Sequence, residues 1–438
     1  MQREIQVNDK LPFAPGLLLS LQHLFAMFGS TILVPNLFHV DPGTILLMNG
    51  IGTLLYILIC KGKIPAYLGS SFAFIAPVTT VLTKYGFNYD GYSLVLGAFV
   101  ITGIIFVAVA VIIRFAGTGW LDVVFPPAAM GAIVALIGLE LIPTAARMAG
   151  LIAPEGQDAA TWTPDGKVIT LSLVTLAVTL LGAVMFRGFP KIIHILIGIV
   201  VGYVLAFPLG LMDTSAIREA SFIQMPEFTS PTFNWSVILT IIPVSLVVIV
   251  EHVGHLLVTG NIVGKNLSKD PGLDRSLLGN GISTILSGFV GSTPNTTYGE
   301  NIGVMALTRV YSIYVIGGAA IIAIILSFSG TFTGAIAAIP SPVMGGVSLL
   351  LFGVIAASGL RILVEQKVDY SKAQNLLLTT VVLVTGLSGA TLTFGSVSLK
   401  GMSLATIVGI LLSLFFRLLQ VTGLSNDTEQ APPAKNPD

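Results

Sequence analysis

Residues 280–286 of this 438-residue chain have the sequence NGISTIL, and a matching run, NGIGTLL, lies 231 positions earlier at residues 49–55. A second pair of matching dipeptides, Gln22-His23 and Glu251-His252, is 229 positions apart, so the two offsets nearly agree. Matches that share one register predict that the chain is built from two copies of one unit.

Each copy also contains a broken apolar segment at the same distance from its first motif. Ser71 follows Gln22 by 49 residues, and Glu300 follows Glu251 by 49 residues. Because Gly and Pro disfavour a continuous helix, we expect short strand-like pieces in both segments. The segments are IPAYLGSSF at 64–72 and TPNTTYGEN at 293–301, with the strand-like pieces around 67–72 and 296–299.

The composition is that of a membrane protein. Charged residues make up 10% of the chain and hydrophobic residues 54%, whereas soluble domains carry about 25% charged residues. The 47 glycines suit close helix packing in a bilayer. The net charge is zero, so nothing points to nucleic acid, and membrane lipid is the expected surrounding. The single cysteine, Cys60, excludes an internal disulfide.

Apolar runs of about 20 residues predict fourteen transmembrane segments. The polar residues 1–10, and the lack of a small-residue cleavage site after the first run, predict that this run stays in the membrane. The fourteen spans are expected at 15–34, 42–60, 65–81, 93–114, 121–146, 168–186, 192–212, 235–259, 275–291, 293–308, 311–329, 339–360, 372–388 and 401–420.

Seven spans separate the members of each matched pair. An odd number of crossings inverts the second copy relative to the first, which predicts an all-α polytopic protein of two inverted seven-span repeats. Inverted repeats with discontinuous helices are typical of secondary transporters, whose substrate binds near the bilayer midplane where the breaks meet. The sequence therefore points to spans 1, 3, 8 and 10 as the site.

The basic residues predict the orientation. With the N-terminus inside, 16 of the 21 Lys and Arg residues lie on the cytoplasmic side of the plasma membrane, as the positive-inside rule requires. Both termini are then cytoplasmic. The basic residues expected outside are Lys84, Arg147, Lys167, Arg218 and Lys400.

Ionisable side chains gather in the same four spans. Glu251 and His255 are spaced i, i+4 and share one helix face, whereas His252 points elsewhere. Glu300 and Asn301 lie in the broken tenth span. An ionised carboxylate inside a span is costly, so each one is a candidate functional residue. The alternative is that Glu251 and His255 pair only to hold helices together.

Residues 300–303 (ENIG), followed by Thr308-Arg309, and the first-span motif Gln22-His23 resemble the signature of the nucleobase–ascorbate transporter family. The similarity covers nearly all of the chain except its ends. Residues 61–74 and 291–301 resemble the uracil-transporting branch, in which Glu rather than Gln occupies the first signature position. The resemblance implies proton-coupled uptake of uracil and a homodimer, with the proton as coupling ion and no metal or other cofactor.

The family also implies a core domain and a gate domain that alternate along the chain. The expected divisions are a cytoplasmic N-terminal tail at 1–13, core segments at 14–115 (spans 1–4) and 235–330 (spans 8–11), gate segments at 116–234 (spans 5–7) and 331–421 (spans 12–14), and a disordered cytoplasmic tail at 422–438.

The resemblance assigns roles to individual residues, with Glu251 and Glu300 on the base, Phe72 and Tyr298 flanking it, and backbone amides near Phe72 and Gly299 meeting its carbonyls. The two histidines of the supporting set, His23 and His252, could instead form hydrogen bonds across helices. Ser71 could instead satisfy backbone groups freed by the break. The substrate-binding set is Glu251, Glu300, Phe72, Tyr298, Gly299, Ser71 and Ser30; the proton-coupling set is Glu251, His255 and Glu300; and the supporting set is Gln22, His23, His252 and Asn301.

Uracil suits this constellation chemically. It is neutral and offers two N–H donors, to which carboxylates form strong charge-assisted bonds, and two carbonyl acceptors, which suit the free N–H groups of helix ends. The alternatives are a carrier of purine, xanthine or another small solute, a channel, and a membrane enzyme. An inorganic anion would need basic residues near the breaks, and none lies between Lys63 and Lys84 or between Arg275 and Arg309.

Overall fold

The apolar runs form long helices. The computed structural model describes residues 4–154, 156–158, 160–395 and 397–425, so the disorder predicted for the C-terminal tail falls almost wholly outside the described residues. Within the described part, eight helices are long and apolar enough to cross a membrane, and a ninth is formed if α15 and α16, bent by 89°, are taken as one span. This confirms a helical, multi-pass membrane protein, while the remaining predicted spans coincide with shorter or more polar helices.

The helices of the first half follow the predicted spans closely. They are α1 (Phe13–Ala26), α2 (Phe28–Phe38), α3 (Pro42–Ile59), α4 (Ile75–Tyr85), α5 (Tyr89–Ala116), α6 (Gly119–Val124), α7 (Pro127–Met148), α8 (Gly166–Met185), α9 (Phe189–Ile192), α10 (His194–Leu209) and α11 (Ser215–Glu219), with a 3₁₀ turn at Phe72–Phe74. Pro126 and Pro127 delay the start of α7, because proline fits the first helical turn but not a helix interior.

The second half begins with α12 (Trp235–Val263), the longest of the described helices. Like the first half, it then contains long helices separated by shorter ones and by turns. Its other helices are α13 (Leu273–Val290), α14 (Gly299–Thr308), α15 (Ile313–Ser327), α16 (Gly330–Ala337), α17 (Ser341–Glu365), α18 (Ala373–Leu387) and α19 (Gly401–Val421), with a π turn at Ser268–Gly272. One difference from the prediction lies in the first span, which is divided at Met27 into α1 and α2.

The predicted strand-like breaks are present. Strand β1 (Leu68–Ser70) pairs antiparallel with β2 (Asn295–Thr297), and Gly69 lies opposite Thr296. Gly69 suits this close approach, because a Cβ atom here would lie 2.4 Å from the end of the Met27 side chain and 3.0 Å from the Tyr298 ring. The pairing satisfies backbone groups that a broken span would otherwise leave unbonded inside the bilayer, and it joins the two halves of the chain at their breaks.

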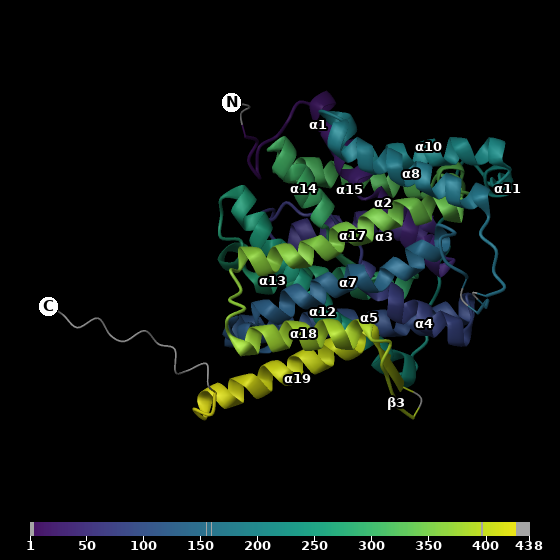
Figure 1. Cartoon of the computed structure of the whole chain (residues 1–438). Helices are drawn as coiled ribbons and strands as arrows, with labels where there is room; N and C mark the ends of the chain where they lie inside the picture. The colour runs from purple at the N-terminus through teal and green to yellow at the C-terminus, as the bar shows by residue number, and fades with distance from the viewer. Residues whose placement is uncertain (1–3, 155, 159, 396, 426–438) are drawn as a thin grey trace.

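A second hairpin, formed by β3 (Thr391–Phe394) and β4 (Val397–Lys400), was not predicted. It connects α18 to α19 and its first strand is exposed. Figure 1 shows it at the edge of the bundle opposite the end occupied by α14.

The helices pack in pairs across the two halves. α5 lies against α13, α3 against α15, and α7 against α17. Gly103 and Gly281 make the α5–α13 approach close, because a Cβ atom on either residue would lie less than 3 Å from the carbonyl oxygen of the other. Small residues at such a crossing are what membrane helices need to approach one another.

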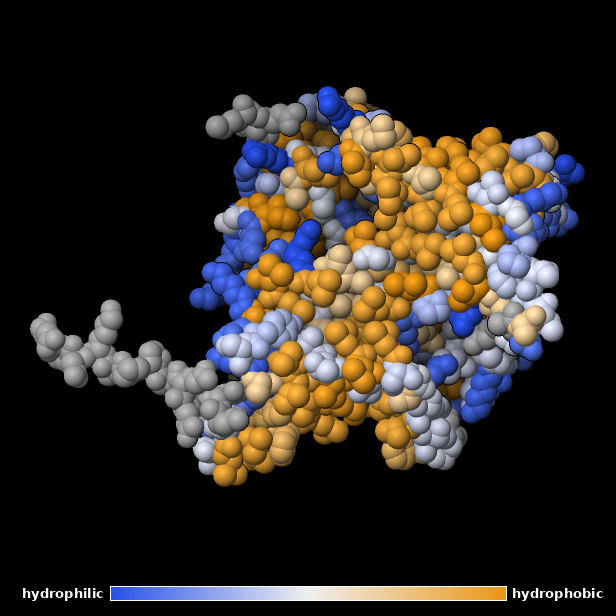
Figure 2. Space-filling view, viewed as in Figure 1, coloured by the Kyte–Doolittle hydropathy of each residue, from blue (hydrophilic) through white to orange (hydrophobic). Residues whose placement is uncertain are grey.

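The surface divides into an apolar zone and two polar edges. Figure 2 shows hydrophobic residues covering the middle of the molecule along the helix direction, with hydrophilic residues collected at both ends. Val184, Phe207 and Ile325 are among the exposed apolar side chains of the described residues. Bilayer lipid is the solvent that such a surface requires.

Candidate functional site

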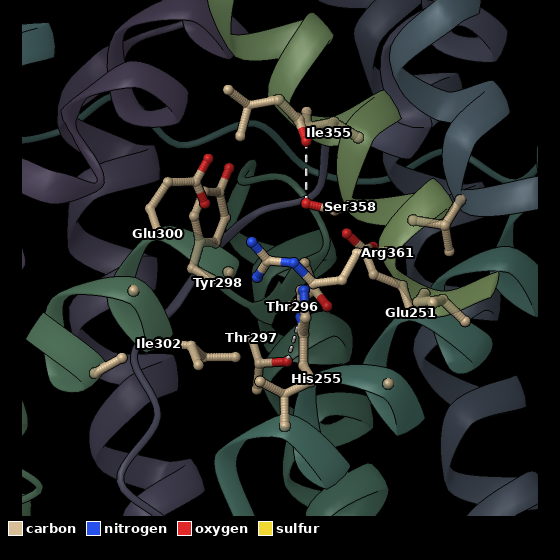
Figure 3. Close-up of a pocket in the computed structure, with 18 of the residues that line it drawn as sticks. Glu251, His255, Thr296, Thr297, Tyr298, Glu300, Ile302, Ile355, Ser358 and Arg361 are labelled. Carbon is tan, nitrogen blue, oxygen red and sulfur yellow. Dashed lines mark hydrogen bonds between the residues drawn. The ribbon is translucent and has the colours of Figure 1, made fainter. Parts of the chain in front are cut away.

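A cavity of about 360 Å³ lies where the two breaks meet α12, and α7 and α17 close its other side (Figure 3). Its size is in the range of small-molecule sites. Its wall contains Phe72, Val134, Glu251, Gly254, His255, Val258, Ile262, Thr296, Thr297, Tyr298, Gly299, Glu300, Ile302, Gly303, Ala306, Val354, Ile355, Ser358, Arg361, Ile362 and Glu365.

Two carboxylates from different elements reach this cavity. Glu251 projects from α12, and Glu300 lies in the first turn of α14. The first intrahelical hydrogen bond of α14 runs from the Ile302 N–H to the Tyr298 carbonyl, so the N–H groups of residues 299–301 precede the bonded part of the helix. A carboxylate beside free N–H groups provides both acceptors and donors for a polar ligand.

Two aromatic rings lie on the cavity wall. The Phe72 and Tyr298 ring centroids are 5.9 Å apart, and the buried Phe352 ring of α17, outside the lining, packs 6.0 Å from Phe72. The Tyr298 hydroxyl donates a 2.6 Å hydrogen bond to the Ser70 carbonyl, which fixes the ring against β1. These rings provide an apolar face against which a planar ligand can stack.

The two histidines of α12 face different surroundings, as their spacing predicts. His255 lines the cavity, and its Nδ1 lies 3.2 Å from the Thr297 hydroxyl. A Cβ atom at Gly299 would lie 3.4 Å from His255 Nε2, so glycine leaves room for the imidazole. His252 turns towards α13, where its Nε2 lies 2.8 Å from the Ser276 hydroxyl.

The remaining predicted residues lie behind the cavity wall. Asn301 donates a 3.0 Å hydrogen bond to the His23 carbonyl, which ties α14 to α1. Gln22, the residue before His23, is also buried. Ser30 donates to the Met27 carbonyl at the break of the first span. The Ser71 N–H donates to the Pro294 carbonyl. Ser30 and Ser71 are therefore buried at the breaks but outside the cavity lining, so a contact between either residue and ligand stays a prediction.

The cavity-lining residues of α17 escaped the sequence reasoning. Ser358, Arg361 and Glu365 lie on one face of α17 at helical spacing and line the cavity. Their i, i+3, i+7 spacing is visible in the sequence, but nothing local shows that this face meets the breaks. Arg361 lines the same cavity as Glu300 and Glu251 (Figure 3).

Arg361 does not make the cavity an anion site. Three carboxylates, Glu251, Glu300 and Glu365, line the same cavity, and Arg361 is the one Lys or Arg among the described lining residues. The excess of acidic groups disfavours an anionic ligand and suits a ligand rich in N–H donors. No group of three or more His, Cys, Asp or Glu that could hold a metal was found in the described part of the chain.

Comparison with known proteins places this chain in a family. A sequence profile described as "Permease family" matches residues 16–395. The chain is 62% identical to the uracil permease of Escherichia coli K12, over 96% of this chain and 95% of that one. It is 60% identical to the uracil permease of Paenibacillus larvae, over 97% and 99% of the two chains, and 46% identical to that of Bacillus subtilis, over 90% and 91%.

Solved structures with the same fold are distant in sequence. The murine solute carrier 26 family member A9 anion transporter, in its inward-facing state, superposes with a TM-score of 0.71 at 11% identity, over 94% of this chain and 69% of that one. The transmembrane domain of a cyanobacterial bicarbonate transporter gives 0.60 at 14% identity, over 94% and 99%. The extent of the profile match and the identity to named permeases are decisive: this chain is a membrane transporter, not an enzyme, and it belongs to the permease family that the resemblance to nucleobase–ascorbate transporters predicts.

Proposed function

We propose that this protein carries uracil across the plasma membrane by proton symport. The observation that carries the proposal is one cavity of about 360 Å³ lined by both Glu251 and Glu300, with the Phe72 and Tyr298 rings on its wall. The two carboxylates accept from the N–H groups of uracil, and the amides at the start of α14 donate to a carbonyl. The relatives at 60% and 62% identity are uracil permeases, which supports the same substrate here.

The acidic pair also supports a role for the proton. Two carboxylates that line one confined cavity resist ionising together, because like charges close to one another repel. A proton bound by the pair lowers the charge of the loaded site, so the loaded carrier moves between faces more readily than the ionised empty one. His255, one turn from Glu251 and held by Thr297, is placed to share that proton.

The helix contacts support two inverted seven-span repeats. In the proposed repeat, α3 corresponds to α13, α5 to α15 and α7 to α17. The α5–α13 contact in one direction therefore corresponds to the α15–α3 contact in the other, and the α7–α17 contact corresponds to itself. We take α1–α5 and α12–α15 as the core domain and α7–α10 and α17–α19 as the gate domain, because the cavity lies between these groups. In the fourteen-span threading, both termini are cytoplasmic, and the homodimer remains a proposal from the family resemblance.

The cavity continues to Arg361 and Glu365, at the C-terminal end of α17. In the proposed topology this end is cytoplasmic, so the structure corresponds to an inward-facing carrier. Closure would then require the gate helices α7 and α17 to move relative to the breaks.

Uptake of radiolabelled uracil into proteoliposomes tests the function. A transporter with this function accumulates uracil when the outside is acidic, and an excess of unlabelled uracil abolishes the signal. Xanthine, a purine and bicarbonate serve as competitors. Uptake of labelled xanthine or bicarbonate without uptake of labelled uracil would contradict the proposed substrate. Uracil uptake that does not change with the pH gradient would contradict proton symport.

A further inference from the structure

The N-terminal segment before α1 is bound to the far end of the helix that carries Glu300. Residues 4–9, which we call the N-terminal strap, run parallel to residues 309–313, and a β-bridge joins Ile5 to Val310. The Ile5 N–H donates to the Arg309 carbonyl at 3.0 Å, and the Tyr311 N–H donates to the Ile5 carbonyl at 2.8 Å. The Ile313 N–H donates to the Val7 carbonyl at 3.0 Å.

The strap places one apolar side chain behind the cavity wall. Val7 is only 1% exposed, although the residues beside it in sequence are polar. It belongs to a small hydrophobic cluster, separate from the main core, with Val263, Ile302, Met305 and Tyr311. Ile302 also lines the cavity, as do Val258 and Ile262, which pack against this cluster. Val7 is therefore one layer removed from the site.

The helix α14 needs support of this kind. It has ten residues, carries Glu300 in its first turn, and ends at Thr308, where the following residue, Arg309, adopts the left-handed conformation with φ 55°. Helices this short are not stable alone, so tertiary contacts at each end decide where they lie. The start of α14 is fixed by the β1–β2 pair, and its end is fixed by the strap.

We propose that the N-terminal strap, through Val7, is a positioning element of the substrate site that holds α14 so that Glu300 meets the substrate. This inference rests on the proposed function, because it assigns Glu300 to uracil. It adds a role for residues 4–9, which the expected domain division leaves in a tail.

The test compares three variants of the full chain in detergent, with uracil affinity measured by calorimetry. Val7→Ser removes the apolar contact and is expected to weaken uracil binding roughly tenfold, since small misplacements of a site residue have effects of this size or larger. Val7→Ile keeps an apolar side chain, so its uracil affinity is expected to stay within about threefold of wild type. Asn8→Ala changes the exposed neighbouring residue and is expected to bind as wild type does.

A double variant separates positioning from general stability. If Val7 acts through Glu300, adding Val7→Ser to Glu300→Gln weakens binding no further, because the two changes affect one interaction. Independent, additive losses would overturn the inference, and so would wild-type affinity in a monodisperse Val7→Ser protein. Should Val7→Ser fail to fold, Val7→Ala takes its place in the same cycle. Absence of uracil binding in the wild-type protein would reject the proposed function instead.

Discussion

Glu300 is the residue at which substrate choice is most directly testable. Glu300→Gln preserves the shape of the side chain but replaces one carboxylate oxygen with an NH₂ donor, which in the proposed site would face a uracil N–H. A hydrogen bond to a charged group contributes about 1.5–3 kcal/mol, so uracil affinity measured by calorimetry should fall by one to two orders of magnitude.

The matched control for that change is Glu365→Gln. Glu365 lines the same cavity but lies at its end, on the last turn of α17. We expect its substitution to leave uracil affinity within about threefold of wild type. Equal effects of the two substitutions would show that net charge, rather than a specific bond from Glu300, determines binding.

Glu251 is the residue at which coupling is testable. Glu251→Gln mimics a permanently protonated carboxyl group, so exchange of uracil between two loaded faces should lose most of its pH dependence. A pH gradient should then no longer drive accumulation. Counterflow and gradient-driven uptake between pH 5.5 and 8 measure both effects, and His255→Ala should reduce coupling less because the carboxylate remains. Wild-type accumulation by Glu251→Gln would assign coupling to another group.

Candidate site residues can be predicted from the sequence when their side chains are of a kind that is costly to bury in a membrane span. Glu251, His255 and Glu300 are identified because ionisable groups inside apolar spans need a reason to be there. Ser358 and Arg361 are not, because the end of a long apolar helix has the same kind of sequence whether it faces a cavity or a neighbouring helix. Their role depends on how α17 packs, and that is decided by contacts between distant segments.

At the scale of elements, glycine pairs decide how closely the halves approach. The α5–α13 crossing depends on Gly103 and Gly281, each of which contacts the backbone of the other. Gly281→Leu should therefore destabilise the protein by about 1–3 kcal/mol through overpacking, seen as a lower thermal unfolding midpoint in detergent. Gly119→Ala is the control, since nothing lies within 4 Å of a Cβ atom there. Equal midpoints for wild type and Gly281→Leu would contradict the close crossing.

Elements were predictable where one local signal controlled them. The run expected at 235–259 became α12 at Trp235–Val263, because a long apolar stretch in lipid must satisfy its backbone as helix. The strands β1 and β2 were signalled by Gly and Pro inside an apolar run. The break at Met27 carries no such signal, since no Pro or polar residue marks it. The β3–β4 hairpin does carry one, because the alternating runs 391–394 and 397–400 flank the two turn residues Gly395-Ser396, but it lies outside the apolar runs, where breaks were expected.

At the scale of the whole molecule, the polar edges determine which loops share a side. The α12–α13 connection bears Asp270, which pairs with Lys63 at 2.5 Å, so the ends of the second and eighth spans meet on one face. The N-terminal strap meets the end of α14 in the same way. These contacts fix relations between loops, while the assignment of either face to the cytoplasm depends on the distribution of Lys and Arg.

That assignment predicts the accessibility of introduced cysteines. Cys60 is buried, so it is first replaced by serine to leave a background without thiols. In right-side-out vesicles, an impermeant thiol reagent should label Asp158→Cys, on an exposed outer loop, and should label Lys269→Cys only after permeabilisation. Both positions are exposed, so a difference between them reports sidedness rather than burial. Labelling of Lys269→Cys in vesicles shown to be intact would reverse the threading, and labelling of both would indicate that the spans between them are miscounted.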